Sequence, residues 1–581
     1  MTALSHPVLP KVMRRSFLEA SARERVLGLA DAGSLQEFCP PAERLASPHL
    51  ATLGLSRAFD DGVVVGRATL AGARVLLAAQ EGRFNGGSVG EVHGAKLVGL
   101  LQGALVSKPA AVLLLLDSGG VRLHEANAGI LAISEVARAM LAVRAAGIPL
   151  LVLLGGSCGA FGGMGIASRL AHRVLMSEEA RLSLSGPEVI ETVKGKEEFN
   201  SRDRALVWRI TGGKTRRALG EADVLVEDDI AAFRQAAINT LAALPLAPAA
   251  DGLVALGQVG LQLRQQALLA RSARFAGVRD GDAVITQLSA LSAAQAALAD
   301  ATTFEQALAA VSHATAAPDT AQVARRALQA DQLLDTEDQA FADRLFGAGS
   351  HQLRVNGHFL AGTAQGPAGP LAVVGTRDRA PIGLTLALAM AEAILNVIRQ
   401  DEVLPTEARR AIVLLADTQG QALSRHEELL GLNGALAHLA LCVDLARRSG
   451  HPLLTLVRHE AVSGGFLSFG MLGDRICALP EAQVRVMDLR AMARVTKLPL
   501  AQLEALAQTS AIFAPGAENF YRLGGIHALW SEQDDWSRAL ADALQHLDRD
   551  DQRAALGAAR GGRVLAQSVA ERVCALAAQV V

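Results

Sequence analysis

Apolar runs that end in glycine-rich turns recur along the chain. The run AVLLLL at residues 111–116 leads into a turn that contains Gly119 and Gly120, and the run LLVLL at residues 150–154 leads into a longer glycine-rich stretch. Short apolar runs bounded by turn residues are typical of strands buried inside a sheet. Stretches long enough for helices separate these runs, and this alternation predicts an α/β fold.

This succession of strands and helices occurs twice. AVLLLLDSGG at residues 111–120 matches AIVLLADTQG at residues 411–420 with an offset of 300 residues, and a glycine pair follows the next apolar run in each copy. The two pairs are Gly162–Gly163 and Gly464–Gly465, with an offset of 302 residues. A repeat of this length indicates two copies of one fold.

The composition changes between the two copies. Residues 246–345 are rich in alanine and glutamine and contain few strand-like runs. We interpret them as a helical connector, and disorder is the alternative because the segment has low complexity. The prediction is an N-terminal domain at residues 1–245, this connector, and a C-terminal domain at residues 346–581.

Charge and composition argue against several classes of protein. A formal net charge of -2 and a pI near 6.7 leave no basic footprint for nucleic acid. No uninterrupted apolar run approaches the roughly 18 residues of a membrane span, and residues 1–25 lack the apolar core of an export signal. The five cysteines are scattered without a C-x-x-C pair, which argues against disulfides and a metal site. We expect a cytoplasmic protein that neither inserts into membranes nor binds nucleic acid.

The stretch GGSCGAFGG at residues 155–163 admits two interpretations. Ser157 stands in a G-x-S-x-G pattern, which is typical of serine hydrolases. Alternatively, the backbone N–H groups of Gly162–Gly163 form an oxyanion hole at the start of a helix, and no side chain attacks. His459 stands where the serine would recur in the second copy, which favours the oxyanion hole. The hydrolase stays open because later histidines could complete a triad.

Further residues near these motifs are candidates for the site. Gly119–Gly120 could line it, or could form only a turn between strand and helix. Cys158 and Ser463 flank the glycine pairs and could contact the substrate, although a buried cysteine is also a common small hydrophobic residue. His124 or Glu428 could supply a proton. For both, a solvated position on a helix is the alternative.

An excess of basic residues lies between residues 194 and 217. Eight basic residues stand there against three acidic ones. Such an excess suits a ligand that carries phosphates, and a solvated charged surface is the alternative. The strongest candidates are Lys194, Lys196, Arg216 and Arg217.

Several longer motifs resemble a known family. NGGSVGEVHGAKLVG, DSGGVRLHEAN and LSGPEVIE resemble the beta subunit of malonate decarboxylase. LLADTQGQALSRHEELLG, EAVSGGFLSFGM and FAPGAENFYRLGGIHALW resemble its gamma subunit. The two subunits are usually separate chains, whereas here they are fused.

The resemblance implies a crotonase-like fold, of the acyl-CoA carboxyltransferase type, in each half. It implies decarboxylation of a malonyl thioester to an acetyl thioester and carbon dioxide in malonate catabolism. The substrate would be carried by an acyl carrier protein subunit on a phosphoribosyl-dephospho-coenzyme A arm, with no cofactor bound covalently to this chain. An acetyl-ACP:malonate ACP transferase subunit would be a second partner, and a homo-oligomer would be compatible with the resemblance.

The resemblance also divides the work between the two glycine pairs. It places the thioester oxygen at Gly162–Gly163, where an enolate would be stabilised, and the carboxylate at Gly464–Gly465. Two alternatives stay open. A biotin-dependent carboxyltransferase would pass the carboxyl group to biotin, although this chain has no A-M-K-M biotin-acceptor motif. A scaffold protein would only dock a carrier.

Overall fold

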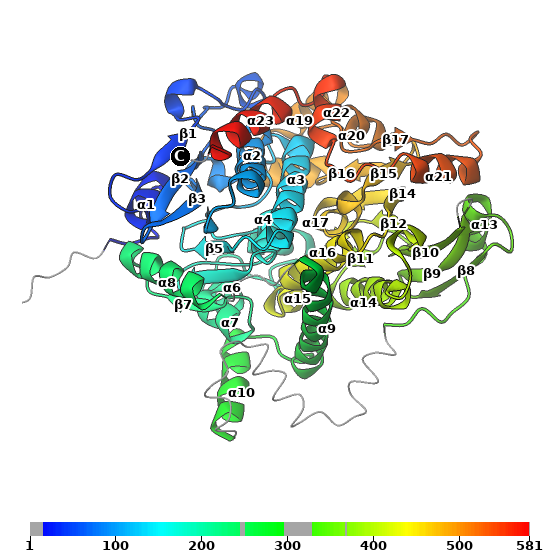
Figure 1. The fold of residues 1–581 in the computed structure, drawn as a ribbon, viewed down its shortest axis with the longest axis horizontal. Coiled ribbons are helices and arrows are strands. Elements are labelled where there is room, and N and C mark those ends of the chain that lie inside the picture. Colours follow the sequence, from blue (N-terminus) through cyan, green and yellow to red (C-terminus); the bar gives the residue numbers. More distant parts are fainter. Residues whose placement is uncertain (1–14, 245–249, 295–327, 367–368, 580–581) are drawn as a thin grey trace, which may run out of the picture.

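Two large sheets form the centre of the molecule (Figure 1). The computed structural model describes residues 15–244, 250–294, 328–366 and 369–579. The first sheet contains β1 (Gln36–Phe38), β2 (Val63–Leu70), β3 (Ala73–Gln80), β4 (Ala111–Leu116), β5 (Leu150–Leu154), β6 (Arg173–Ser177) and β7 (Val224–Val226) in that order. The second contains, in spatial order, β17 (Ala528–Leu529), β15 (Arg475–Ala478), β14 (Leu453–Val462), β12 (Ala411–Thr418), β10 (Gly369–Thr376), β9 (Phe359–Gly366) and β8 (His351–Asn356).

The two sheets share one topology. Strands β1 to β3 pair antiparallel and β3 to β7 pair in parallel. Likewise, β8 to β10 pair antiparallel, and β10, β12, β14, β15 and β17 pair in parallel. Parallel neighbours need long crossover connections, usually helices. These are α2 (Glu91–Ser107) and α3 (Ala126–Ala145) in the first half and α14 (Leu384–Asp401) and α16 (Leu432–Arg448) in the second. The predicted α/β repeat is confirmed.

Short helices cover the sheet faces and edges. In the first half they are α1 (Ala22–Leu29), α4 (Gly162–Ser168), α5 (Pro187–Lys194), α6 (Arg204–Thr211), α7 (Gly213–Ala218) and α8 (Ile230–Ala243). In the second half they are α13 (Thr336–Phe346), α15 (Arg425–Leu429), α17 (Ser463–Leu467), α18 (Leu489–Thr496), α19 (Leu500–Thr509), α20 (Ala517–Arg522), α21 (Trp536–Gln545), α22 (Arg553–Ala559) and α23 (Ala566–Ala577). Two more short strands, β11 (Pro381–Ile382) and β13 (Gly420–Gln421), pair with each other, and β16 (Gln483–Arg485) pairs with β14.

The crossover helices α2 and α14 begin in the same way. A glutamate that follows the next long strand accepts the first N–H of each helix. Glu125 Oε2 accepts from Glu91 N–H at 2.9 Å, and Glu427 Oε2 accepts from Leu384 N–H at 2.8 Å. A carboxylate at this position satisfies an orphan donor and complements the helix dipole. The repeat therefore extends to the capping groups.

One hydrophobic core joins the two halves. Alternate side chains of a strand point to opposite faces of a sheet. Leu114 of β4 and Leu414 of β12 lie in the same core cluster, while Leu113 and Leu415 face separate outer cores. The inner faces of both sheets thus share one apolar interior, and removing it from water stabilises the association of the halves.

The C-terminal helix returns to the first half. Helix α23, at the red end of the colour scale, lies next to α2 (Figure 1). Gly99 and Gly103 of α2 permit this contact, because an added Cβ would lie 2.3 Å from Ala570 O and 2.4 Å from Ala577 Cβ. The last helix of the second copy therefore completes the packing of the first.

Connector helix α9 (Ala250–Arg274) packs on the second half and binds the first. Gln265 Nε2 donates to Leu388 O at 2.8 Å, and Arg271 Nη1 donates to Leu219 O at 2.6 Å. A second helix, α10 (Gly281–Ala294), follows, and residues 295–327 lie outside the described residues. The domain boundaries at residues 245 and 346 stay a prediction.

Helix α3 is an apolar helix of the interior. Within the described parts of the chain it is the one helix long and apolar enough to cross a membrane, and 89% of its apolar window is buried inside the protein. Its residues belong to the core that the two halves share. The apolar character of α3 is accounted for by this packing.

Candidate active site

The interface between the halves brings the two glycine pairs together. Helix α4 follows β5 and α17 follows β14, and the two helices contact each other. A Cβ on Gly163 would lie 2.9 Å from Leu467 Cδ2, and one on Gly464 would lie 3.3 Å from Leu184 Cδ1. Each pair therefore faces side chains of the other half.

In the structure, the two glycine pairs align with an offset that is one residue smaller than their offset in the sequence. An offset of 302 residues holds at Cys158 and Glu460, whose N–H groups both donate to the aspartate after the preceding strand, Asp117 or Asp417. At the helices the offset is smaller. Helix α4 begins at Gly162 with φ +56°, and α17 begins at Ser463 with φ +49°. Gly163 therefore corresponds to Gly464, which corrects the pairing of Gly162–Gly163 with Gly464–Gly465.

The backbone N–H groups of the two glycine turns differ in whether another group of the protein accepts from them. Gly162 N–H donates to Leu184 O at 2.7 Å, so it is not available to a ligand, which corrects the prediction for this residue. For Gly163 N–H we find no acceptor within the described residues. Gly464 N–H donates to the side-chain Oε1 of Gln421 at 3.2 Å. Among the described residues, Gly163 N–H therefore has no protein acceptor, and Gly464 N–H has a side-chain amide as its acceptor.

Glycines at the ends of β4 and β12 form walls against these turns. Gly120 has φ +101° and Gly420 has φ +109°, conformations that favour glycine. A Cβ on Gly120 would lie 2.9 Å from Phe161 O, directly before α4. Gly119 N–H donates to Gly86 O at 2.8 Å. The predicted wall at Gly119–Gly120 therefore lies against the first glycine pair.

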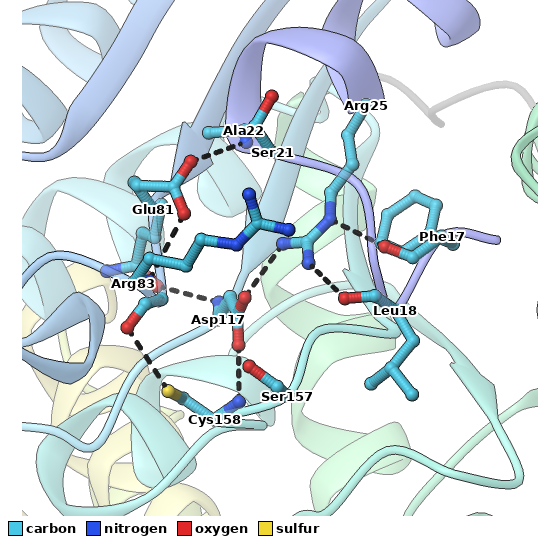
Figure 2. A network of polar contacts seen from close by, with 12 residues as sticks. Phe17, Leu18, Ser21, Ala22, Arg25, Glu81, Arg83, Asp117, Ser157 and Cys158 are labelled. Carbon is cyan, nitrogen blue, oxygen red and sulfur yellow. Dashed lines mark hydrogen bonds and ion pairs between the residues drawn. The ribbon is translucent and has the colours of Figure 1, made fainter.

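A buried aspartate holds the loop before α4 (Figure 2). Asp117 Oδ1 accepts from Cys158 N–H at 2.6 Å, and Asp117 Oδ2 accepts from Arg25 Nη1 at 2.9 Å. Arg25 also donates to the carbonyls of Phe17 and Leu18. The sequence did not lead us to predict that Asp117 holds this loop. The aspartate at the equivalent position of the second copy, Asp417, was a signal that could have indicated it.

Its counterpart in the second half has a different partner. Asp417 Oδ1 accepts from Glu460 N–H at 3.1 Å, and Asp417 Oδ2 lies 3.1 Å from His459 Nδ1. Burial is the largest single influence on the pKa of Asp417 and raises it, but the hydrogen bonds from His459 and from backbone N–H groups together outweigh burial, so the pKa lies below its usual value. The aspartate therefore keeps its place in the fold while its side-chain partner changes from arginine to histidine.

Ser157 does not form a nucleophile elbow. It lies exposed in a bend, and α4 begins only at Gly162. Its carbonyl accepts from Arg181 Nη2 at 2.5 Å, and within the described residues no histidine hydrogen-bonds to its hydroxyl. Cys158 beside it is half-buried, its Sγ contacts Gly82 O at 3.5 Å, and burial raises the pKa of the thiol. These features do not support covalent catalysis at either residue.

Glu428 connects the two halves instead of lying at the surface. The side chain is 0% exposed. Its carboxylate accepts from Ser183 Oγ at 2.5 Å, Leu184 N–H at 2.8 Å and Ser185 N–H at 2.7 Å. Burial raises its pKa, against these donors. The solvated position is wrong, because three donors of the first half hold this carboxylate. Its part as a proton donor stays a prediction. No sequence signal links residues so far apart.

His124 occupies the turn before α3. It is half-buried, and burial, followed by the charge of Arg122, lowers its pKa. Arg122 itself is fully buried and donates to Asp61 Oδ2 at 2.9 Å and Glu125 Oε1 at 2.7 Å. The part of His124 as a proton donor stays a prediction.

The four basic candidates do not share one surface. Lys194 and Lys196 are exposed and Arg217 is half-buried. Arg216 is fully buried, and its Nη2 donates to Ile210 O and Glu428 O. Burial therefore removes Arg216 from any phosphate that stays at the surface, which corrects its inclusion among the four.

Comparisons with known proteins agree with this architecture. A profile of the carboxyl transferase domain matches residues 19–251, and a profile of the malonate decarboxylase gamma subunit matches residues 377–577. Malonyl-S-ACP:biotin-protein carboxyltransferase MADC of Malonomonas rubra is 45% identical over 235 residues, which are 38% of this chain and 74% of that protein. MADD of the same organism is 33% identical over 201 residues, which are 32% of this chain and 68% of that protein. In a Pseudomonas malonate decarboxylase hetero-tetramer solved with malonate, one chain is 42% identical, with 43% of this chain and 92% of that chain covered and a TM-score of 0.39.

Proposed function

The chain belongs to the malonate decarboxylase carboxyltransferase family, with a beta-subunit-like half and a gamma-subunit-like half in one chain, and we propose that it releases carbon dioxide from a malonyl thioester. The observation that carries this proposal is the meeting of two equivalent glycine turns at the interface. Gly163 lies against Leu467 of the second half, and Gly464 lies against Leu184 of the first. In this proposal one substrate contacts both turns.

The reaction needs an oxyanion site more than it needs a nucleophile. The bond between the α-carbon and the carboxylate breaks, carbon dioxide leaves, and the electron pair is delocalised onto the thioester oxygen as an enolate. We assign this oxygen to Gly163 N–H. Losing one such donor costs other enzymes about 10²- to 10³-fold in rate. A proton then adds to the α-carbon, and His124 is our candidate donor.

We assign the substrate carboxylate to the second turn, at Gly464. Leu184 and Ile166 of the first half approach this residue, with closest distances of 3.3 Å and 3.5 Å from a Cβ placed on it. An apolar surrounding favours the loss of a charged carboxylate as neutral carbon dioxide. The same surrounding requires that the bound carboxylate meet hydrogen-bond donors.

The carrier arm would enter along α5. This helix begins at Pro187, two residues after Ser185, and ends at Lys194. Eight helical residues span about 12 Å, so the exposed Lys194 and Lys196 lie where the phosphates of a phosphoribosyl-dephospho-coenzyme A arm would pass. The partners in this proposal are an acyl carrier protein subunit and an acetyl-ACP:malonate ACP transferase subunit, in the cytoplasm, and assembly into a homo-oligomer is compatible with it.

Carbon dioxide release tests the proposal directly. We would supply malonyl carrier protein, or malonyl-CoA, to the purified full chain and measure carbon dioxide. We expect release without biotin, and no release with a competent carrier would contradict the proposal.

A biotin-dependent transfer is the second candidate, because MADC and MADD are named as carboxyltransferases that act on a biotin protein. Such an enzyme would need a biotin protein as carboxyl acceptor. Avidin separates the two cases, since it blocks biotin and leaves direct decarboxylation unchanged.

A further inference from the structure

Gln421 links the second glycine turn to the first half of the molecule. Its Oε1 accepts from Gly464 N–H at 3.2 Å, and its Nε2 donates to Ser185 Oγ at 3.4 Å. Strand pairing fixes its backbone, because Ile382 of β11 is the partner of Gln421 in β13. Ser185 is held in turn by Glu428. The amide therefore lies at the meeting point of both halves.

The first half has valine at the equivalent position. Val121 pairs with Val89 in a parallel bridge, as Gln421 pairs with Ile382. The preceding glycines also match, since Gly120 N–H donates to Ser118 Oγ at 3.1 Å and Gly420 N–H donates to Thr418 Oγ1 at 3.0 Å. The repeat thus presents an apolar side chain at one turn and an amide at the other.

This asymmetry matches the two groups of the substrate that we assign to the turns. A thioester carbonyl is neutral before reaction, whereas a carboxylate carries a full charge and needs several donors when it is desolvated. Around Gly464 the nearest atoms to an added Cβ are Gln421 Oε1 at 3.1 Å and the side chains of Leu184 and Ile166. Gln421 is the polar group among them.

We propose that Gln421 is the specificity-determining residue that selects a carboxylated acyl group over a plain one. This inference rests on the proposed function. When malonyl thioester binds, Oε1 leaves Gly464 N–H, one carboxylate oxygen takes its place on that N–H, and Nε2 of Gln421 donates to the carboxylate. An acetyl group has no such oxygen and makes neither contact.

The test compares two reactions that share the enolate. Decarboxylation of malonyl-CoA needs the carboxylate contact, whereas exchange of the α-protons of acetyl-CoA with deuterated water does not. Gln421→Met keeps the length of the side chain and removes the amide. We expect kcat/KM for malonyl-CoA to fall about 10- to 100-fold, mainly through KM, as for loss of a hydrogen bond to a charged group. Proton exchange should stay within about threefold.

Gln421→Glu is a second test, because a negative charge at this position repels the substrate carboxylate. We expect a larger loss of decarboxylation than in Gln421→Met, again with proton exchange spared. Gln419→Met is the matched control, since Gln419 is an exposed neighbour two residues away and its variant should behave as the parent.

Two outcomes would overturn the assignment. If Gln421→Met lowers decarboxylation and proton exchange by the same factor, the amide is only structural. If it changes neither reaction, the amide does not contact the carboxylate. A parent enzyme that shows neither reaction would instead overturn the proposed function, before any variant is compared.

Discussion

Gly163 and Gly464 occupy equivalent positions but meet different neighbours. A Cβ on Gly163 would lie 2.7 Å from Ile133 Cγ2 and 2.9 Å from Leu467 Cδ2, within packed apolar side chains. A Cβ on Gly464 would meet the Gln421 amide first, at 3.1 Å. A side chain at either glycine therefore displaces a different part of the site, so the two turns can be tested separately.

Replacing each glycine by valine should separate the thioester site from the carboxylate site. Gly163→Val forces α4 away from its neighbours, and we expect a loss of about 10²-fold or more in both decarboxylation and α-proton exchange. Gly464→Val should suppress decarboxylation and spare much of the exchange. Gly260→Val is the control, because an added side chain there meets nothing within 4 Å. The reverse pattern in folded variants would exchange the two assignments.

Ser157 provides a test of the hydrolase alternative. Its exposed bend and the absence of a histidine partner within the described residues predict that the hydroxyl takes no part in catalysis. Ser157→Ala should therefore keep carbon dioxide release within roughly tenfold of the parent, since no acyl-serine forms. A loss of about 10⁴-fold in a folded variant would favour the hydrolase, because removal of a serine nucleophile has that effect elsewhere.

At the scale of elements, Glu428 carries a link from α15 to the segment before α5. That segment also provides Leu184 O, which accepts from Gly162 at the start of α4. One side chain of the second half therefore helps to position helix α4 of the first. Three donors from the other half satisfy the oxygens of this buried carboxylate.

Glu428→Ala should reduce stability and activity together. Three buried donors lose their acceptor, and we expect the free energy of unfolding to fall by about 2 to 3 kcal/mol, measured by thermal or urea denaturation. Decarboxylation and proton exchange should fall in parallel because α4 loses its support. Glu402→Ala, at an exposed glutamate after α14, is the control. If Glu428→Gln melts like the parent and yet loses exchange, Glu428 is the proton donor after all.

The contact of α23 with α2 is a second element-scale link. Gly99→Val would place a Cβ 2.3 Å from the carbonyl oxygen of Ala570, a backbone atom that can yield only if α23 shifts. We expect a destabilisation of about 1 to 3 kcal/mol, as for overpacked cores, measured as a lowered midpoint of thermal unfolding relative to Gly260→Val. An unchanged midpoint would show that α23 does not dock on α2 in solution.

At the scale of the whole molecule, the chain consists of two copies of one fold, and each copy stabilises the other. The inner faces of both sheets share one core, Glu428 binds the first half, and α23 completes it. The two glycine turns meet between the copies, so neither half holds both turns by itself.

We expect the two halves to work as separate chains. Co-expressed fragments divided within residues 295–327 should elute together in size-exclusion chromatography and should release carbon dioxide at a rate near that of the intact chain. The apolar area of the shared core drives this association. Fragments that elute separately, while each remains folded, would contradict the shared core.

The sequence by itself determined the repeat, the α/β class and the two glycine turns. These depend on local signals, since apolar runs, turn glycines and their spacing are read within short windows. The match of Asp117 with Asp417 was visible in the same way. Even the difference between Val121 and Gln421 is visible when the two copies are compared. The comparison does not show what the Gln421 amide contacts.

Only the tertiary structure decided which groups meet. It showed that Gly162 N–H is bound by Leu184, that Ser463 begins α17, and that Glu428 and Arg216 are buried at the interface. Such facts depend on packing between segments up to hundreds of residues apart, where no periodicity or spacing carries information. The neighbouring sequence does not distinguish a solvated glutamate from one that binds the other half. The difference lies in the surface that folding brings against the side chain.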